Sequence, residues 1–267
     1  MDIEKIFPLV LIGMFVAFAV LEALLPARPL ARVKGWRLFG VVAFFVTGAT
    51  SALSPLLYID FARAHRLGDL EWLGTLGGAA VAFVALELVG YWVHRASHWT
   101  PLWRAYHQVH HSAERVDIYG SAFFHPLEIV VGGVMGAVVG TMVLGVSAQA
   151  SALAGLVAIS ISMLQHTNVK TPRWLGYIVQ RPESHSVHHR TGFHGNNYSR
   201  IPLIDLLFGT FENPEYFEPD TGFYPGASRR VLAMLVGMDV SEPRRPLEKF
   251  SARASAQATA EKLATSD

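Results

Sequence analysis

The sequence predicts an all-α integral membrane protein: a bundle of four or five membrane-spanning helices with a helical cap on the cytoplasmic side. The composition is the first reason, because only 16% of the 267 residues are charged and 51% are hydrophobic, whereas a soluble domain carries roughly 25% charged residues. Apolar runs of the length that a membrane-spanning helix needs, about 20 residues, recur along the chain. Of the 12 histidines, all but His65 lie between His94 and His194, at and beyond the ends of these runs. The cap is therefore expected to carry a histidine cluster.

The composition also excludes several classes of function. The chain has no cysteine, which excludes disulfides, thiolate metal sites, iron–sulfur clusters and a cysteine nucleophile. Its net charge of +1 gives no sign of a nucleic-acid partner.

Three spans are expected before the first histidine cluster. Residues 7–25 form an apolar run broken only by Glu22, and the acidic residues before it favour a retained anchor over a cleaved signal peptide. Residues 38–59 contain no charged side chain, and residues 72–93 contain one acid, Glu87. Each run is long enough to cross a bilayer.

A hairpin of two further spans is expected after these. Residues 129–169 contain no Asp, Glu, Lys or Arg, and the run is too long for one span. The segment 145–150 is the natural turn. A re-entrant hairpin that does not fully cross the bilayer is the alternative.

The basic residues predict the orientation of these spans. The loop after the first span carries Arg28, Arg32, Lys34 and Arg37, so it is expected on the cytoplasmic side. The third span then returns to the cytoplasm near His94, and the hairpin leaves and re-enters the same side. All the clustered histidines are therefore expected at one membrane face.

The predicted domain organisation has three parts. Residues 1–69 are N-terminal spans, and residues 70–240 are a catalytic domain of spans plus cap. Residues 241–267, rich in Ala, Ser, Pro and charge, are expected to be a disordered tail.

Three histidine clusters carry the chemical signal: HRASH at 94–98, HQVHH at 107–111 and HSVHH at 185–189. Residues three or four apart share a helix face, so the first and last histidine of each cluster can bind one ion. His110 and His188 are turned by about 100° from the next residue and can lean toward a second ion. Eight histidines exceed the four ligands of a structural zinc site, so two ions are predicted. Surface histidines on cap helices are the alternative.

Residue types alone leave the metal and the class of function open. Imidazole suits zinc, copper, iron and nickel, and the His-Glu-x-x-His motif of zinc hydrolases is missing. A zinc-dependent membrane hydrolase acting on lipid remains the main alternative to redox chemistry. A bis-histidine haem carrier would need histidines facing each other across the spans. A transport protein would need ionisable residues along the spans, and the expected spans contain only Glu22 and Glu87.

At these clusters the chain resembles the fatty acid hydroxylase superfamily, also called the sterol desaturase family. The resemblance runs from about residue 87 to residue 210. It rests on the histidine clusters in their contexts, YWVHRASH at 91–98, HQVHHS at 107–112 and HSVHH at 185–189, together with FHPLE at 124–128, QHTN at 165–168, NY at 197–198 and DLLFGT at 205–210. It implies a di-iron oxygenase that uses O2 as co-substrate to hydroxylate or desaturate a lipid, such as a sterol or a fatty acyl chain.

The resemblance also implies a set of metal ligands. They are His94, His98, His107, His110, His111, His166, His185, His188 and His189. Some relatives have a further histidine where this chain has Ser162, and His125 is the candidate to complete the set. A helix cap, or a residue that contacts the ligands without binding metal, is the alternative role for His125.

Six other residues are expected around the ligands: Glu87, Tyr91, Asn168, His194, Asn197 and Asp205. Glu87 lies seven residues before His94, on the same helix face, and a buried acid within a span is a functional hypothesis by default. It is expected to accept a hydrogen bond from a ligand imidazole, directly or through Tyr91. An interhelical hydrogen bond unrelated to metal is the alternative.

Partners follow from the resemblance and from motifs that the sequence lacks. The lipid substrate is expected to enter from the bilayer, with its polar end near the cap. The chain has no Gly-x-Gly-x-x-Gly fingerprint and no haem or iron–sulfur motif. An external donor of ferredoxin or cytochrome type, with its reductase, is therefore expected to supply electrons.

Overall fold

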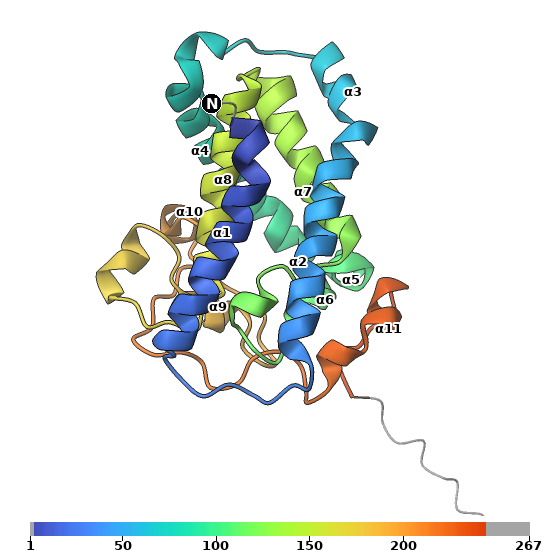
Figure 1. The fold of residues 1–267 in the computed structure, drawn as a ribbon, viewed down its shortest axis with the longest axis vertical. Helices are drawn as coiled ribbons and strands as arrows, with labels where there is room; N and C mark the ends of the chain where they lie inside the picture. Colours follow the sequence, from blue (N-terminus) through green and yellow to red (C-terminus); the bar gives the residue numbers. More distant parts are fainter. Residues whose placement is uncertain (1–2, 244–267) are drawn as a thin grey trace, which may run out of the picture.

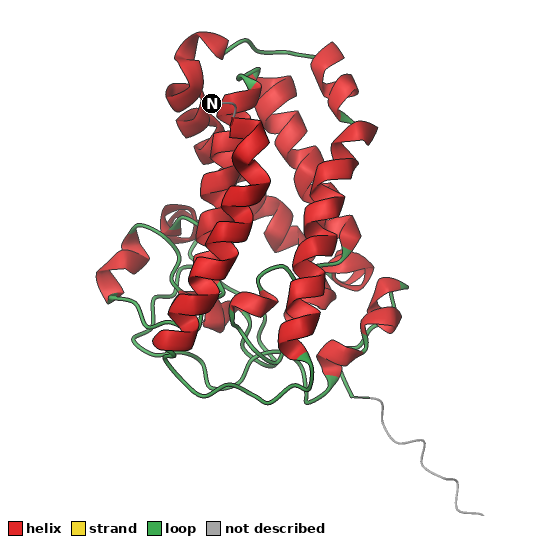
Figure 2. Ribbon diagram, viewed as in Figure 1, coloured by secondary structure: helices red, strands yellow, loops and turns green. Residues whose placement is uncertain are grey.

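The protein is helical throughout the part of the chain that the computed structural model describes, residues 3–243 (Figures 1 and 2). Helices account for 64% of it, with no strand. This confirms the all-α prediction. The predicted tail, from residue 244 onward, lies outside the described residues.

Five helical segments are long and apolar enough to cross a membrane. They are α1 (Ile3–Leu24), α2 (Trp36–Leu53) with η1 (Ser54–Leu57), α4 (Gly74–Ser97), α7 (Pro126–Gly136) with the π-helical η5 (Ala137–Leu144), and α8 (Ala148–Gln165). The number of candidate spans is thus five, the larger of the two predicted numbers, and each segment overlaps the run from which it was predicted.

The turn of the predicted hairpin lies between η5 and α8, inside the segment expected for it. Gly145 ends η5 with φ 60, a left-handed conformation that glycine adopts without steric cost. The Ser147 side chain then accepts a hydrogen bond from the Ala150 backbone N–H and caps α8. Gly145 and Ser147 thus provide the local signals that end one helix and start the next.

Small residues allow the central helices α4 and α8 to pack closely. Ala79 and Ala82 on α4 pack with Ala150 and Ala154 on α8 in one buried cluster, the close approach that small residues permit between membrane helices. The opposite faces of the spans expose large apolar side chains, such as Leu76 at 78%. Such an apolar exterior suits a bilayer rather than water.

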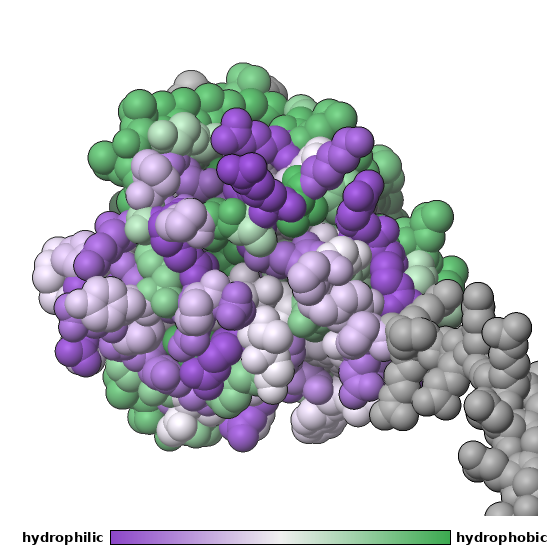
Figure 3. All heavy atoms as spheres, turned by 90° about the horizontal axis from the view of Figure 1, so that it is seen from below, coloured by the Kyte–Doolittle hydropathy of each residue, from purple (hydrophilic) through white to green (hydrophobic). Residues whose placement is uncertain are grey.

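Short helices gather beside the lower half of the bundle in Figure 1, at the end where the basic loop 25–35 lies, and form the cap. Seen from below in Figure 3, the middle of this end is largely hydrophilic, and a hydrophobic band borders it along the top of the view. The cap contains α5 (Thr100–Leu102), the π-helical η3 (Trp103–His107), α6 (Gln108–His111), η4 (Ile118–Gly120), η6 (Arg173–Tyr177), α9 (Pro182–His188), α10 (Pro202–Leu207), η7 (Ala227–Arg229) and α11 (Val231–Leu235). At the other end, α3 (Ile59–Ala64) and η2 (Glu71–Leu73) join α2 to α4.

Glu22, the buried acid of α1, forms hydrogen bonds that connect the cap to the spans. One carboxylate oxygen of Glu22 accepts hydrogen bonds from the backbone N–H groups of Ile118 and Asn168, each at 2.9 Å. Nearby, the Trp36 indole N–H donates to Asp117 at 2.8 Å. These contacts join segments of the cap that are far apart in sequence to the lower ends of α1 and α2.

Candidate metal centre

Nine histidines converge into two groups at the cap end of the spans, and within each group the ligand atoms lie within 4.8 Å of one another. The first histidine group is His94, His98, His107, His111 and His188. The second histidine group is His110, His166, His185 and His189. The end of α4, the segment η3–α6, the end of α8 and the helix α9 supply these side chains. No single segment supplies a complete group.

Within each group the rings turn the same nitrogen toward one another. The Nε2 atoms of His94 and His188 lie 3.0 Å apart in the first histidine group. In the second, the Nε2 atom of His166 lies 3.2 Å from that of His110 and 3.1 Å from that of His185. Two imidazole nitrogens bound at about 2.1 Å to one metal ion, at a right angle, stand about 3.0 Å apart. The observed spacing matches that arrangement.

Oxygen atoms behind the rings determine which nitrogen carries the proton. The Nδ1 atoms of His94 and His188 lie 2.6 and 2.7 Å from the backbone carbonyl oxygens of Tyr198 and Asn196. His166 makes the same contact with the carbonyl of Ser162 at 2.7 Å. A carbonyl oxygen only accepts, so Nδ1 must donate and Nε2 keeps its lone pair.

Burial keeps these rings neutral. It lowers the pKa of His166 to about 4, and burial together with neighbouring rings holds the pKa of His185 and His188 well below the usual range. Neutral rings protonated on Nδ1 would direct Nε2 lone pairs at each other, which is repulsive unless a cation lies between them. Neutral imidazole is also the form that binds metal. Both groups therefore fit a metal ion.

The helical spacing predicted the three i, i+4 pairs within these groups, whereas His166 followed from the family resemblance. His94 joins His98, His107 joins His111, and His185 joins His189, as the i, i+4 argument requires. His110 and His188 each join the group opposite to that of the rest of their cluster. The structure thus brings together nine of the ten predicted ligands.

His125 is the exception, and the ligand prediction for it is corrected. Its Nδ1 accepts a hydrogen bond from the Leu127 backbone N–H at 3.0 Å, which makes it the N-cap of α7. Its Nε2 lies 3.4 Å from the carbonyl oxygen of Leu235. Both ring nitrogens are therefore used in structural contacts outside the two groups.

Glu87 and Tyr91 do not contact a ligand imidazole, contrary to the prediction. Glu87 instead pairs with Arg200, its Oε1 lying 2.6 Å from the guanidinium Nε. The Tyr91 hydroxyl contacts Thr210 at 3.1 Å and accepts from Arg95 at 3.0 Å. Both residues support the loop around Tyr198 rather than a metal ligand directly.

The polar residues of the NY and DLLFGT motifs also act through that loop. Asp205 accepts from the backbone N–H groups of Tyr198 and Ser199 at 2.8 and 2.9 Å. The Asn197 side chain donates to the carbonyls of Ser184 and Glu212 at 2.8 and 2.9 Å. Together these bonds fix the carbonyl oxygens that orient His94 and His188.

Of the two remaining predicted residues, one lies beside a ligand and one does not. His194 places its Nδ1 3.2 Å from the Nδ1 of His111, and burial lowers the pKa of His194 to about 4. Asn168 donates to the carbonyl of Arg28 at 2.7 Å and so anchors the loop that follows α1.

Two residues that orient ligands were missed. Glu128 lies 2.7 Å from the Nδ1 of His107, and the side-chain oxygen of Gln180 lies 3.0 Å from the Nδ1 of His185. Glu128 carried a usable signal, because it is an acid in the first turn of a span, as unusual there as Glu87 in its own span. Gln180 carried none, since a glutamine in a polar loop is ordinary.

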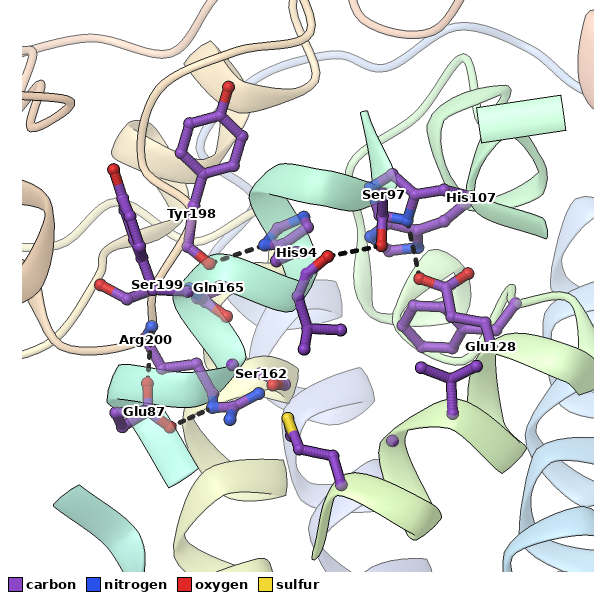
Figure 4. A pocket seen from close by; sticks show the side chains of 18 of the residues that line it. Glu87, His94, Ser97, His107, Glu128, Ser162, Gln165, Tyr198, Ser199 and Arg200 are labelled. Atoms are coloured by element: carbon purple, nitrogen blue, oxygen red, sulfur yellow. Dashed lines mark hydrogen bonds and ion pairs between the residues drawn. The ribbon is translucent and has the colours of Figure 1, made fainter. Parts of the chain in front are cut away.

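A cavity of about 180 Å³ lies beside both histidine groups. Side chains from α4, α7 and α8 and from the loop 198–200 line it, including His94 and His107 of the first group and His110 of the second. Figure 4 shows Glu128 directed at His107, and Tyr198 with its carbonyl directed at His94. A molecule in this cavity would lie against histidine side chains of both groups.

The nine histidines of the two groups lie inside the part of the chain that matches a known family. The model of the fatty acid hydroxylase family matches residues 79–210. The chain is 31% identical over 168 residues to a very-long-chain aldehyde decarbonylase of Oryza sativa subsp. indica, covering 58% of this chain and 27% of that protein. It is 29% identical over 157 residues to a Delta(7)-sterol-C5(6)-desaturase of Nicotiana tabacum, covering 56% and 55%.

A third relative is a methylsterol monooxygenase of Aspergillus fumigatus, 29% identical over 152 residues, covering 54% of this chain and 50% of that protein. The chain thus spans about a quarter of the rice protein and about half of the other two. No solved structure gives a significant match.

Proposed function

Residues 79–210 belong to the fatty acid hydroxylase family, and on that premise we propose that this protein is a membrane di-iron oxygenase acting on a lipid. It uses O2 and external electrons to hydroxylate or desaturate an unactivated C–H bond. Sterols and fatty acyl chains are the candidate substrate classes, since relatives carry sterol desaturase and methylsterol monooxygenase in their names. The observation that carries the proposal is the pair of neutral histidine groups beside one cavity.

The proposed ligands are the nine residues of the two histidine groups. When bound there, two iron ions supply the activation of O2 and the removal of hydrogen from carbon. The chain's own residues do the rest. The carbonyls of Tyr198, Asn196 and Ser162 hold three imidazoles in the ligating tautomer. Glu128 and Gln180 orient the imidazoles of His107 and His185. The cavity excludes bulk water from the reacting carbon.

The cap is proposed to face the cytoplasm, because the basic loop with Arg28, Arg32 and Lys34 lies at the same end as the histidine groups. A ferredoxin- or cytochrome-type donor and its reductase are the proposed partners there. The Trp103 ring supports electron entry from the cap, because its centroid lies 5.1 Å from that of His111 and 5.7 Å from that of Phe223. Phe223 lines a surface groove of about 910 Å³.

One observation favours the zinc hydrolase as a second candidate. Such an enzyme needs a carboxylate base beside its histidines, and Glu128 lines the cavity with one buried oxygen that lacks a hydrogen-bond partner among the described residues. The two candidates differ in their need for O2. A hydrolase works without it and with zinc.

The proposal is tested by lipid profiling of cells that express the wild-type chain or His110→Ala. We expect a lipid that gains one oxygen atom or loses two hydrogen atoms with the wild type, and only under air. His125→Ala is the matched control and should give the same product, because His125 caps α7 outside both groups. Unchanged lipids with the wild type, or a product formed without O2, would overturn the oxygenase proposal.

A further inference from the structure

An ion pair forms part of the cavity wall. The Arg200 Nε donates to Glu87 Oε1 at 2.6 Å, and the Arg200 backbone N–H donates to Glu87 Oε2 at 3.0 Å. The Glu87 side chain is 1% exposed and that of Arg200 is 28% exposed, and both residues line the cavity. The charge of Glu87 is therefore fully engaged by one residue.

The outer half of the guanidinium remains available. Only Nε and the backbone N–H of Arg200 donate hydrogen bonds within the described part of the chain, so the terminal nitrogens Nη1 and Nη2 have none. In Figure 4 the guanidinium reaches past Glu87 toward the middle of the cavity. A Cβ built at Gly90 would be in van der Waals contact with Nη2, at 3.9 Å, and with the Met135 methyl carbon, at 3.8 Å, so the missing side chain of Gly90 leaves room for about one carbon atom beside the guanidinium.

We propose that Nη1 and Nη2 of Arg200 bind an uncharged oxygen group of the lipid substrate, such as a hydroxyl, aldehyde, ketone or amide. A bare hydrocarbon in the cavity would displace water from these donors and leave them without acceptors, which a site built for hydrogen bonding rejects strongly. A carboxylate would add a second negative charge beside Glu87 with only one cation to share, and an uncompensated charge is costly in a poorly solvated site. A neutral acceptor satisfies the donors without changing the charge.

The position of the ion pair also separates the bound oxygen from the oxidised carbon. Glu87 stands seven residues before His94 on α4, which is roughly 10 Å along the helix axis. It lies on the side of the histidines that faces the spans. The substrate oxygen therefore binds beside the cap loop that carries Arg200, on the side of the histidine groups that faces the spans. Val131 and Met135 give the cavity apolar wall for the carbon chain in between.

This inference rests on the proposed function only in taking the cavity to hold the lipid, so its test measures binding and needs no turnover. The protein, purified in nanodiscs and loaded with zinc, is titrated with hexadecane, 1-hexadecanol and hexadecanoic acid. We expect the wild type to bind the alcohol at least about tenfold more tightly than either of the others, one lost hydrogen-bonding partner being worth roughly that factor. Equal binding of alcohol and hydrocarbon, or tighter binding of the acid, would overturn the proposal.

A variant of Arg200 and a matched control test whether the preference for the alcohol depends on the Glu87–Arg200 ion pair. Arg200→Lys keeps a cation opposite Glu87 but removes the forked donors, so the preference for the alcohol over hexadecane should fall below about threefold. Arg104 lies on the cap surface, where it pairs with Asp239. The matched control Arg104→Lys should therefore keep the preference for the alcohol. A preference that survives Arg200→Lys would contradict the assignment.

Glu87→Gln provides an independent test if Arg200→Lys fails to fold. It removes the compensating charge with little change of shape, so binding should shift from the alcohol toward hexadecanoic acid. An unchanged order of the three ligands in this variant would likewise contradict the proposal. Failure of the proposed oxygenase activity with the alcohol preference intact would leave the binding site standing and remove only the chemistry.

Discussion

Individual side chains of the metal centre are oriented by the oxygen atoms behind them. His94 and His188 donate to backbone carbonyls, whereas His107 lies against a carboxylate, that of Glu128. A carboxylate behind a ligand imidazole raises its basicity more than a neutral carbonyl does. The first histidine group therefore has both more ligands and the only side-chain carboxylate contact to a ligand ring found among the described residues.

Replacing Glu128 by Gln should weaken metal binding at the first histidine group. The amide still offers an oxygen to His107 but no negative charge, and loss of such a partner typically costs 10–100-fold in metal affinity. Competition with a chelator, followed by metal quantification, measures the change. Glu114→Gln is the control, because Glu114 accepts hydrogen bonds from Gly226 and Ser228 in the cap and belongs to neither histidine group. An E128Q protein that holds its metal as tightly as the control would contradict the assigned role.

The same reasoning separates two neighbouring histidines. His110 belongs to the second histidine group and His125 caps α7, so His110→Ala should lose about half of the bound metal and His125→Ala none. Instead, His125→Ala should lower the stability by about 1 kcal/mol through the lost cap. Metal content and thermal unfolding, measured on both variants, check this pair. Metal loss in His125→Ala would restore that residue to the ligand set.

At the scale of helices, close packing depends on particular glycines. On α2, a Cβ at Gly40 would collide with the carbonyl oxygen of Tyr119, whereas a Cβ at Gly48 would meet nothing within 4 Å. The carbonyl belongs to the backbone of the cap and cannot rotate away. Gly40 therefore determines how closely the cap approaches α2.

Gly40→Ala should accordingly destabilise the protein by about 1–3 kcal/mol, the usual cost of overpacking. Gly48→Ala, on the same helix, should be neutral or stabilise by up to about 1 kcal/mol through helix propensity. Thermal unfolding of the two variants in one detergent makes the comparison. Equal unfolding temperatures would mean that α2 and the cap do not pack as described.

Helical periodicity explains why so much of the site was predictable. Spacings of three and four residues within a cluster are local, so the division of His107, His110 and His111 between two groups followed from one helical turn. The partners of Glu87 could not be predicted this way, because Arg200 lies 113 residues further along the chain. The same holds for the carbonyls of Tyr198 and Asn196, which any residue type could supply. Sequence patterns predict the histidines that gather in the two groups, and the fold alone identifies what orients them.

At the scale of the whole molecule, the arrangement of spans places both histidine groups at one end. Loop 25–35 and the cap lie at that end, and the connection from α3 to α4 lies at the other (Figure 1). The natural chain has no cysteine, so single cysteines can report the membrane side of each loop without background.

Arg32→Cys and Tyr216→Cys should react with a membrane-impermeant maleimide only from the cytoplasmic side, and Leu67→Cys only from the other side. Tyr216 is 67% and Leu67 75% exposed, so access does not limit the reaction. Labelling of intact cells and of inverted vesicles distinguishes the two sides. Reaction of Arg32→Cys and Leu67→Cys from the same side would contradict the bundle as a transmembrane structure.

The proposed function depends on each of the two histidine groups holding one metal ion. Metal quantification after anaerobic purification tests this most directly. The account predicts close to two iron ions per chain in the wild type. A ratio near one, or zinc as the metal that remains bound after expression in iron-replete cells, would contradict it.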